Sequence, residues 1–399
     1  MPAIESLRIR KVLDSRGNAT VEVDVRVGGV VGRAAAPSGA STGTHEVRAW
    51  PKGGVDEGIA RFRDVIAAKL SGVDASDQEE VDRLLHAVDG TQDFSRIGGN
   101  VAVATSLAVA KAAAAAARQP MFASVGPGRT LPFPLGNVIG GGRHAFGGTD
   151  IQEFSTLAQS PSPSRAVFAN AAVHKAVAGM LTKRLPGEAI GRGDEGAWVA
   201  KLSNEDALAV LVEACAQVSK EVGFPCSPSL DMAASEFYRQ GMYVYKDRSL
   251  TPERQVEYVA GLVESHGLAL VEDPLDQEDF DGYARLTEFV GDACVIVGDD
   301  LFVTNPERLR TGIEKGAANA ILIKPNQIGT LTDTARTVAL ARDAGYRTVM
   351  SHRSGETTDD TIAHLAVAFG SFAIKTGAVG GERTAKLNEL IRIEEYLGG

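Results

Sequence analysis

The sequence predicts an α/β protein in which a C-terminal (β/α)8-type barrel follows a smaller N-terminal α+β domain. In the second half of the chain, short apolar runs alternate with helical patterns, and six of the runs each lead into a reactive side chain: Asp231, Glu272, Asp299, Lys324, His352 and Lys375. In the first third, strand patterns come first and helical patterns follow, which is typical of an α+β unit. Gly126-Pro127-Gly128 separates the two parts.

The six reactive side chains are 41, 27, 25, 28 and 23 residues apart. These intervals are near the roughly 30 residues per βα unit of a barrel of about 250 residues. Side chains at the carboxyl ends of barrel strands face one shared site. Because unpaired charges are too costly to bury in a core, we expect three carboxylates, two amines and an imidazole to meet in one pocket.

The N-terminal part predicts three strands and then helices. Thr20–Val27 alternates apolar and polar residues and ends at Gly28-Gly29, as a half-buried strand before a hairpin turn does. Neighbouring strands are expected at Ile4–Leu13 and Val30–Ala36, and helices at Val55–Leu70, Gln78–Ala87 and Asn100–Arg118. The break after these helices gives domains 1–126 and 127–399.

Strand and helix patterns then alternate to the end of the chain. Several predicted helices open with Ser, Thr or Asn, the residues that cap helix N-termini. The helices are expected at Ser164–Leu185, Asn204–Val222, Pro252–His266, Asn305–Lys315, Leu331–Ala344, Thr358–Phe369 and Lys386–Leu397.

Composition narrows the class of protein. Three cysteines are too few for a disulfide framework and favour a reducing, cytoplasmic location. The formal charge of −10 disfavours a general nucleic-acid binder. We find no apolar stretch approaching the roughly 20 residues of a membrane span, and the charges within residues 1–11 argue against a signal peptide.

Three loops add candidates. The small residues of Pro37–Glu46, Ser41 among them, suit a lid over a ligand, although an ordinary Gly/Ser turn has the same composition. Gly140-Gly141-Gly142 permits close backbone approach and precedes His144, with Gln152-Glu153 soon after. A lone histidine is more often structural. The glycine-flanked pair Asp194-Glu195 is either a solvated turn or a weak metal loop.

The strand-end residues suggest specific chemistry. Asp231, Glu272 and Asp299 offer three hard oxygen ligands, which suits Mg²⁺, and no Cys/His cluster with zinc spacing appears. The alternative for these acids is a set of surface turns or salt bridges. Arg353 and Ser354 follow a strand and fit a bidentate anion site such as phosphate.

The motifs together resemble the enolase family over essentially the full chain. The matching segments are Asp14–Asn18, Ser38–Gly43, Gly193–Gly196, Glu272–Pro274, Asp299–Leu301, Lys324 with Asn326–Thr330, Ser351–Thr357 and Ile374–Ala378. The resemblance implies a ββαα(βα)6 barrel whose second strand is antiparallel. It also implies reversible dehydration of 2-phospho-D-glycerate to phosphoenolpyruvate, two Mg²⁺ ions per site, and a homodimer or octamer.

The resemblance also implies residue roles. Asp231, Glu272 and Asp299 look like ligands of the first Mg²⁺, and Ser41 like the lid ligand of the second. Lys324 looks like the base at C2, and Glu195 like the acid at the leaving hydroxyl, with Glu153 and Gln152 nearby. Lys375 resembles the residue that pairs with the substrate carboxylate. Arg353 and Ser354 resemble the phosphate clamp. His144 and His352 look like closing or orienting groups.

Lys324 needs a lowered pKa to act as a base, since a lysine amine ordinarily has a pKa of about 10.4. We expect Lys375 and the metals to favour its neutral form.

Three positions depart from the family pattern, namely Arg143, Pro325 and Ala197. Two other functions stay open on the sequence alone: an acid-sugar dehydratase or cycloisomerase of the same superfamily, and a binding protein that kept the fold.

Overall fold

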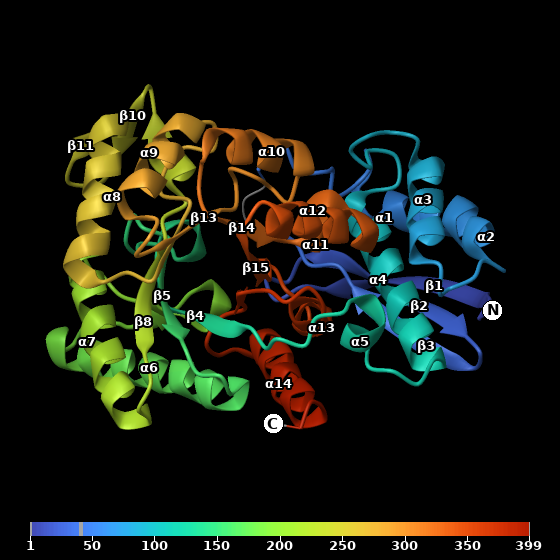
Figure 1. Cartoon of the computed structure of the whole chain (residues 1–399), viewed down its shortest axis with the longest axis horizontal. Coiled ribbons are helices and arrows are strands. Elements are labelled where there is room, and N and C mark those ends of the chain that lie inside the picture. The colour runs from blue at the N-terminus through green and yellow to red at the C-terminus, as the bar shows by residue number, and fades with distance from the viewer. Residues whose placement is uncertain (1, 40–42, 399) are drawn as a thin grey trace.

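The computed structural model describes residues 2–39 and 43–398. Figure 1 shows a barrel ringed by helices on one side and a smaller sheet with its own helices on the other. The predicted fold class is confirmed: the three-stranded sheet comes first and a closed eight-stranded barrel follows.

The N-terminal sheet is an antiparallel meander of β1 (Ile4–Leu13), β2 (Ala19–Val27) and β3 (Val30–Ala35). These bounds agree with the predicted strands to within one residue. The helices are α1 (Gly54–Arg61), α2 (Ala67–Leu70), α3 (Gln78–Asp89), α4 (Gly99–Ala116) and α5 (Met121–Val125). The predicted helix Val55–Leu70 is interrupted by a π-helical stretch, Phe62–Ile66.

Helix α4 packs across β2 and β3. The backbones come very close: a Cβ on Gly32 would lie 2.2 Å from the carbonyl oxygen of Ala108. The alanines of α4 therefore serve close packing. Contrary to the prediction, this helix is also long and apolar enough to cross a membrane, but 78% of its 18-residue apolar window is buried inside the protein.

The barrel strands follow the order β4-β5-β8-β12-β13-β14-β15-β16, and β16 pairs with β4 to close the ring. Their bounds are Phe133–Gly140, Glu153–Ala158, Cys226–Asp231, Leu270–Glu272, Val295–Gly298, Ala320–Ile323, Arg347–Ser351 and Ala373–Lys375. Strand β5 is antiparallel to both neighbours, as the resemblance implied. A separate apolar cluster from these strands, including Leu135, Leu270 and Leu322, fills the barrel interior.

The reversed β5 aligns acids from three strands. Because β5 runs the other way, its first residue, Glu153, lies beside Asp231, the last residue of β8. Asp231 in turn lies beside Glu272, the last residue of β12. Three carboxylates therefore form a row at one end of the barrel.

Helices cover the outside of the barrel, and most lie where the sequence predicts them. They are α6 (Pro163–Arg184), α7 (Asn204–Val222), α8 (Pro252–His266), α9 (Phe280–Val290), α10 (Pro306–Lys315), α12 (Leu331–Asp343), α13 (Thr361–Ala368) and α14 (Gly381–Tyr396). Helix α9 was not predicted, and neither was the small sheet of β9 (Tyr238–Arg239), β10 (Met242–Val244) and β11 (Ser249–Leu250). Helix α14 begins five residues before its predicted start.

The first domain reaches the mouth of the barrel. Ser38 and Gly355 exchange two backbone hydrogen bonds of 2.7 and 2.8 Å. His86 of α3 lies 2.6 Å from Asp333 of α12. The Ser38–Gly355 bonds hold the loop that contains Ser38 against the barrel loop that follows β15, and the His86–Asp333 contact joins α3 to α12.

Candidate active site

Twelve of the thirteen predicted site residues line one cavity at the carboxyl end of the barrel. They are His144, Gln152, Glu153, Glu195, Asp231, Glu272, Asp299, Lys324, His352, Arg353, Ser354 and Lys375, and Gly39 and Ser351 complete the lining. Ser41 lies outside the described residues. The cavity measures about 30 Å³, room for about one water molecule, so a phosphorylated three-carbon acid needs side chains to move aside.

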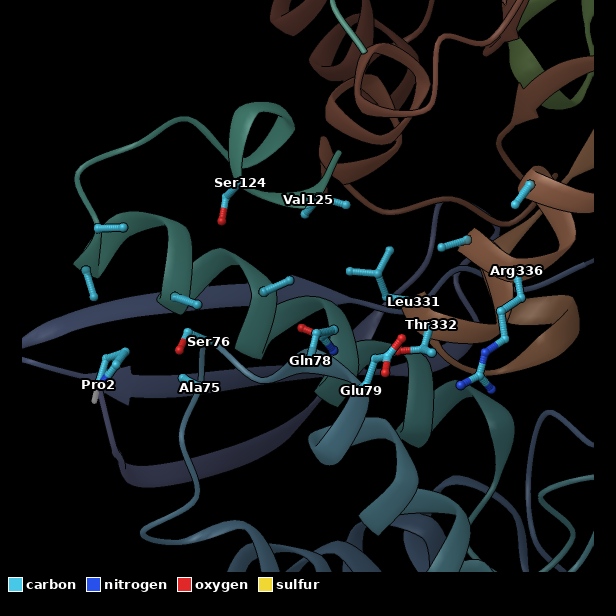
Figure 2. A pocket seen from close by; sticks show the side chains of 16 residues that line it. Pro2, Ala75, Ser76, Gln78, Glu79, Ser124, Val125, Leu331, Thr332 and Arg336 are labelled. Atoms are coloured by element: carbon cyan, nitrogen blue, oxygen red, sulfur yellow. The ribbon is translucent and has the colours of Figure 1, made fainter. Parts of the chain in front are cut away.

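A much larger cavity, of about 770 Å³, lies between α4, α5 and α12. Figure 2 shows its lining, which consists mostly of short apolar side chains, with Gln78 and Glu79 near the middle of the view and Arg336 at the right. Its polar groups do not form a convergent ionic cluster like that of the barrel cavity. Size alone therefore does not identify the candidate active site.

Lys375, at the end of β16, bridges the row of carboxylates. Its Nζ donates to Asp231 Oδ2 at 2.9 Å and to Glu272 Oε2 at 2.6 Å, and it lies 3.3 Å from Glu153 Oε1. Burial would lower the pKa of Lys375, but these carboxylates raise it well above its usual value. Lys375 is therefore a fixed cation.

Lys324 follows β14 in extended backbone geometry (φ −124°, ψ 104°), as expected for the residue before Pro325. Its Nζ forms an ion pair with Asp299, and Gln327 Nε2 donates to the other Asp299 oxygen at 3.0 Å. Burial would lower the pKa of Lys324, but Asp299 raises it more than Arg353 and Lys375 lower it. The expected neutral amine is therefore not found in this ion-paired arrangement.

The acids in and beside the cavity repel one another. Burial and nearby Asp231 raise the pKa of Glu272 well above its usual value, although Lys375 opposes this. Burial and Asp299 raise the pKa of Asp273 to about 7. This excess of buried carboxylate oxygens fits a hard divalent cation, which takes such ligands, and Asp231, Glu272 and Asp299 could hold it.

Among the described residues, two groups of three side chains have possible metal-ligand atoms within 4.8 Å of one another. One group is His144, Glu153 and Glu195, and the other is Asp273, Asp299 and Asp300. Neither group is the predicted trio of Asp231, Glu272 and Asp299. Within the predicted trio, Asp231 and Glu272 pair with Lys375, whereas Asp299 pairs with Lys324. Asp273 already accepts from Tyr283 Oη and the backbone amides of Asp299 and Asp300, which is a structural role.

Two histidines flank Glu195. His352 Nε2 lies 3.0 Å from Glu195 Oε1, and His144 Nδ1 lies 3.9 Å from the same oxygen and 3.2 Å from Glu153 Oε1. Burial would raise the pKa of Glu195, but the two imidazoles and Arg383 together hold it well below its usual value. Glu195 is thus a carboxylate here, and its neighbours hold the protons.

Glu195 itself has left-handed backbone geometry, with φ 65° and ψ 7°. Non-glycine residues rarely adopt it, and such strain is concentrated at functional sites. The next residue, Gly196, also has a positive φ of 73°. The glycines on either side of Asp194-Glu195 therefore support a bend that aims one carboxylate into the barrel.

Three buried polar atoms face this cavity without a well-aligned hydrogen bond: His144 Nδ1, Glu153 Oε1 and His352 Nε2. Each has a charged neighbour at 3.0–3.3 Å. Buried polar groups left this way are costly unless a ligand completes them. The three atoms therefore mark the face that a polar ligand would contact.

Arg353 is held by the first domain. Its Nη1 and Nη2 donate to Glu46 Oε2 and Oε1, each at 3.0 Å, and Nη1 also donates to Asn326 Oδ1 at 3.0 Å. The predicted phosphate clamp is therefore oriented before any ligand arrives.

The structure accounts for the three departures. Arg143 Nε donates to Glu236 Oε2 at 2.7 Å, so its charge is paired with that acid. Pro325 occupies the first position of helix α11 (Pro325–Ile328), where proline is well tolerated. Ala197 is buried in ordinary extended geometry, so it fits without strain.

Sequence reasoning gave no role to Glu46, Gln327 or Arg383. Gln327 lies in a quoted motif, and Glu46 ends the predicted lid loop, so their positions carried a partial signal. Arg383 lies on α14, where one arginine in a helical pattern does not stand out.

Comparisons with known proteins cover almost the whole chain. A family model described as "Enolase, N-terminal domain" matches residues 4–125, and one described as "Enolase, C-terminal TIM barrel domain" matches residues 128–399. Proteins named "Enolase" are 55% identical in Methanothermobacter thermautotrophicus, 54% in Natronomonas pharaonis and 49% in Picrophilus torridus. Each match covers 99% of this chain and 97%, 99% and 99% of the respective relative.

Proposed function

The chain belongs to the enolase family, and we propose that the barrel cavity carries the family's reversible dehydration of 2-phospho-D-glycerate to phosphoenolpyruvate. The observation that carries this assignment is the gathering of acids, lysines, histidines and one arginine around a single buried cavity. The family match argues against the two alternative functions, an acid-sugar dehydratase and a binding protein that kept the fold.

We assign removal of the C2 proton to Lys324. Lys324 directly follows barrel strand β14 and lines the cavity, where the substrate's α-carbon would lie. To accept a proton, Lys324 must leave its pairing with Asp299. Asp299 would instead serve as a metal ligand together with Asp231 and Glu272.

Mg²⁺, which the enolase family uses, would supply positive charge where the substrate carboxylate gains negative charge. Lys375 adds a permanent cation beside the same acids. We propose two Mg²⁺ ions per site, with Ser41 as a ligand of the second.

At the other end of the substrate, we assign protonation of the departing C3 hydroxyl to Glu195. His352 and His144 lie on its two sides, and His144 can return a proton to it. Glu153 and Gln152 complete this wall of the cavity. Arg353 and Ser354 would grip the phosphate, since a guanidinium presents paired donors to phosphate oxygens.

We further propose a homodimer or octamer, a cytoplasmic location and domains at 1–126 and 127–399. The three described cysteines are all free and buried, which agrees with a reducing compartment. The division of the family match at residues 125 and 128 supports the domain proposal.

An ultraviolet assay of enol product tests the function. The purified chain should convert 2-phospho-D-glycerate in Mg²⁺, lose turnover in excess chelator and regain it when Mg²⁺ is restored. Full activity in chelator would refute the metal assignment. Activity only on a non-phosphorylated hydroxy acid would refute the substrate.

A further inference from the structure

Arg383 is a fully buried cation behind the proposed active site. It lies in the first turn of α14, and its side chain has no exposed surface. Nη1 lies 2.9 Å from His352 Nδ1 and donates to the Arg353 carbonyl oxygen at 2.6 Å, while Nη2 donates to the Ser354 carbonyl oxygen at 2.7 Å. Burying a charge is costly, and none of the roles proposed above requires the buried charge of Arg383.

The contact between Arg383 and His352 determines which ring nitrogen of His352 carries the proton. A guanidinium has five N–H donors, no acceptor, and keeps its charge in proteins. His352 Nδ1 must therefore accept from Arg383 and carry no proton. The neutral ring then holds its proton on Nε2, the nitrogen 3.0 Å from Glu195 Oε1.

The same contact disfavours a charged ring, because an imidazolium would direct an Nδ1–H at the guanidinium. The charged groups that act on His352 are Glu195, Arg383 and Glu356 of its own loop. Burial lowers the pKa of His352 to about 4, with Arg383 adding to this and Glu195 opposing it. For His144, burial is outweighed by Glu195 and Glu153, which raise its pKa. The pKa values of the two histidines beside Glu195 are therefore shifted in opposite directions.

We propose that Arg383 is a positioning residue that keeps His352 neutral with its proton on Nε2, the nitrogen beside Glu195, and that also fixes the backbone of the Arg353-Ser354 clamp. This deepens the proposed function and rests on the roles given there to His352 and Glu195. Arg383 lies behind the ring and does not itself line the cavity.

Lys386, three residues further along α14, offers a matched control. It is 1% exposed, its Nζ donates to the Thr357 carbonyl oxygen at 2.8 Å, and it lies 2.8 Å from Glu356 Oε2. It therefore anchors the same loop with a buried charge through Glu356 and Thr357, without an Nδ1 contact of the kind Arg383 makes.

Nitrogen-15 NMR of histidine-labelled, full-length protein tests the proton position directly. At about pH 7, the His352 signal, identified by its loss in His352→Gln, should show a bare Nδ1 and a protonated Nε2. A protonated Nδ1, in either the other tautomer or the imidazolium, would overturn the proposal. No turnover is required, so failure here is distinct from failure of the proposed function.

Kinetics separate positioning from mere anchoring. In Arg383→Met, the acidic limb of the kcat profile should move to higher pH by about one unit, toward the ordinary histidine pKa. Arg383→Lys should reverse most of this shift because an ammonium still donates to Nδ1. Lys386→Met should lower thermal stability without moving the limb. An unmoved limb in Arg383→Met, or an equal shift in Lys386→Met, would overturn the role. If Arg383→Met does not fold, the NMR measurement decides.

Discussion

The guanidinium of Arg353 donates to both carboxylate oxygens of Glu46, at 3.0 Å each, so that a residue of the first domain holds the proposed phosphate clamp of the barrel. Both side chains are buried, at 4% and 7% exposed. The pair thus links the geometry of the proposed anion site to the docking of the two domains.

Replacing Glu46 with alanine should destabilise the protein, since Arg353 would keep a buried charge with fewer acceptors. Removal of one partner from a buried ion pair costs about 3–5 kcal/mol. Calorimetry should show a clear fall in the unfolding midpoint. The control Glu80→Ala removes an exposed pair with Arg83 and should change the midpoint little. Equal effects from both substitutions would contradict this account of Glu46.

Lys324→Ala should strongly slow proton exchange at C2 while substrate still binds, because the proposed base is lost and the proposed clamp remains. The expected loss in exchange rate is about 10²–10⁴-fold, the usual contribution of a general base. Deuterium exchange from solvent into 2-phospho-D-glycerate measures it. Lys315→Ala, on the surface of α10, is the control. Exchange that persists in Lys324→Ala would point to another base.

Glu195→Gln should slow overall dehydration more than C2 exchange. The amide has the size of the carboxylate but cannot deliver an acidic proton to the departing hydroxyl, whereas Lys324 is untouched. Comparing exchange with product formation in one sample measures the split. Equal losses in the two rates would argue against the acid role of Glu195.

Glu272→Gln should weaken Mg²⁺ binding, because it removes one charged oxygen ligand from the proposed trio. Titration calorimetry with Mg²⁺ alone reads this without turnover. Asp333→Asn, which changes an acid at the domain contact instead, should bind Mg²⁺ as the unaltered chain does. Unchanged affinity in Glu272→Gln would remove Glu272 from the ligand set.

The His86–Asp333 contact predicts a pH-dependent domain junction. The hydrogen bond to Asp333 raises the pKa of His86. The stabilisation is therefore complete below the ordinary histidine pKa of about 6.5 and is lost as pH rises through the raised value. The difference in unfolding midpoint between the natural chain and His86→Gln should be largest near about pH 6 and shrink toward about pH 8.5. A constant difference across this range would exclude the pair as its source.

Regular elements could be predicted from the sequence where the hydrophobic pattern was strong. β1 and α8 begin and end at the predicted residues, since β1 ends at the turn signal Asp14–Asn18 and Thr251 caps α8. Helix α9, Phe280–Val290, was missed in the stretch between Glu272 and Asp299. The π-helical turn Phe62–Ile66 leaves no mark on side-chain periodicity, so one long helix was predicted there.

The residues of the candidate site also differ in how well the sequence alone could predict them. Asp231, Glu272 and Lys375 end parallel strands, so the strand-end rule located them without knowledge of any relative. Glu153 begins a reversed strand and Glu195 occupies a strained loop, so their loops marked them only as candidates and the family resemblance gave them roles. Glu46 and Arg383 act through contacts between distant segments, which spacing along the chain does not reveal.

The reversed direction of β5 has a consequence for how this barrel tolerates changes in loop length. At the other barrel strands, loop residues inserted on the active side come after the reactive side chain and leave its attachment to the strand intact. At β5, loop residues inserted on the active side come before the reactive side chain, Glu153. A single residue added between Gly142 and Gln152 could be absorbed only by loosening that loop or by slipping the strand, and a slip would turn Glu153 out of line with Asp231. Natural variation and engineering alike should therefore spare this segment.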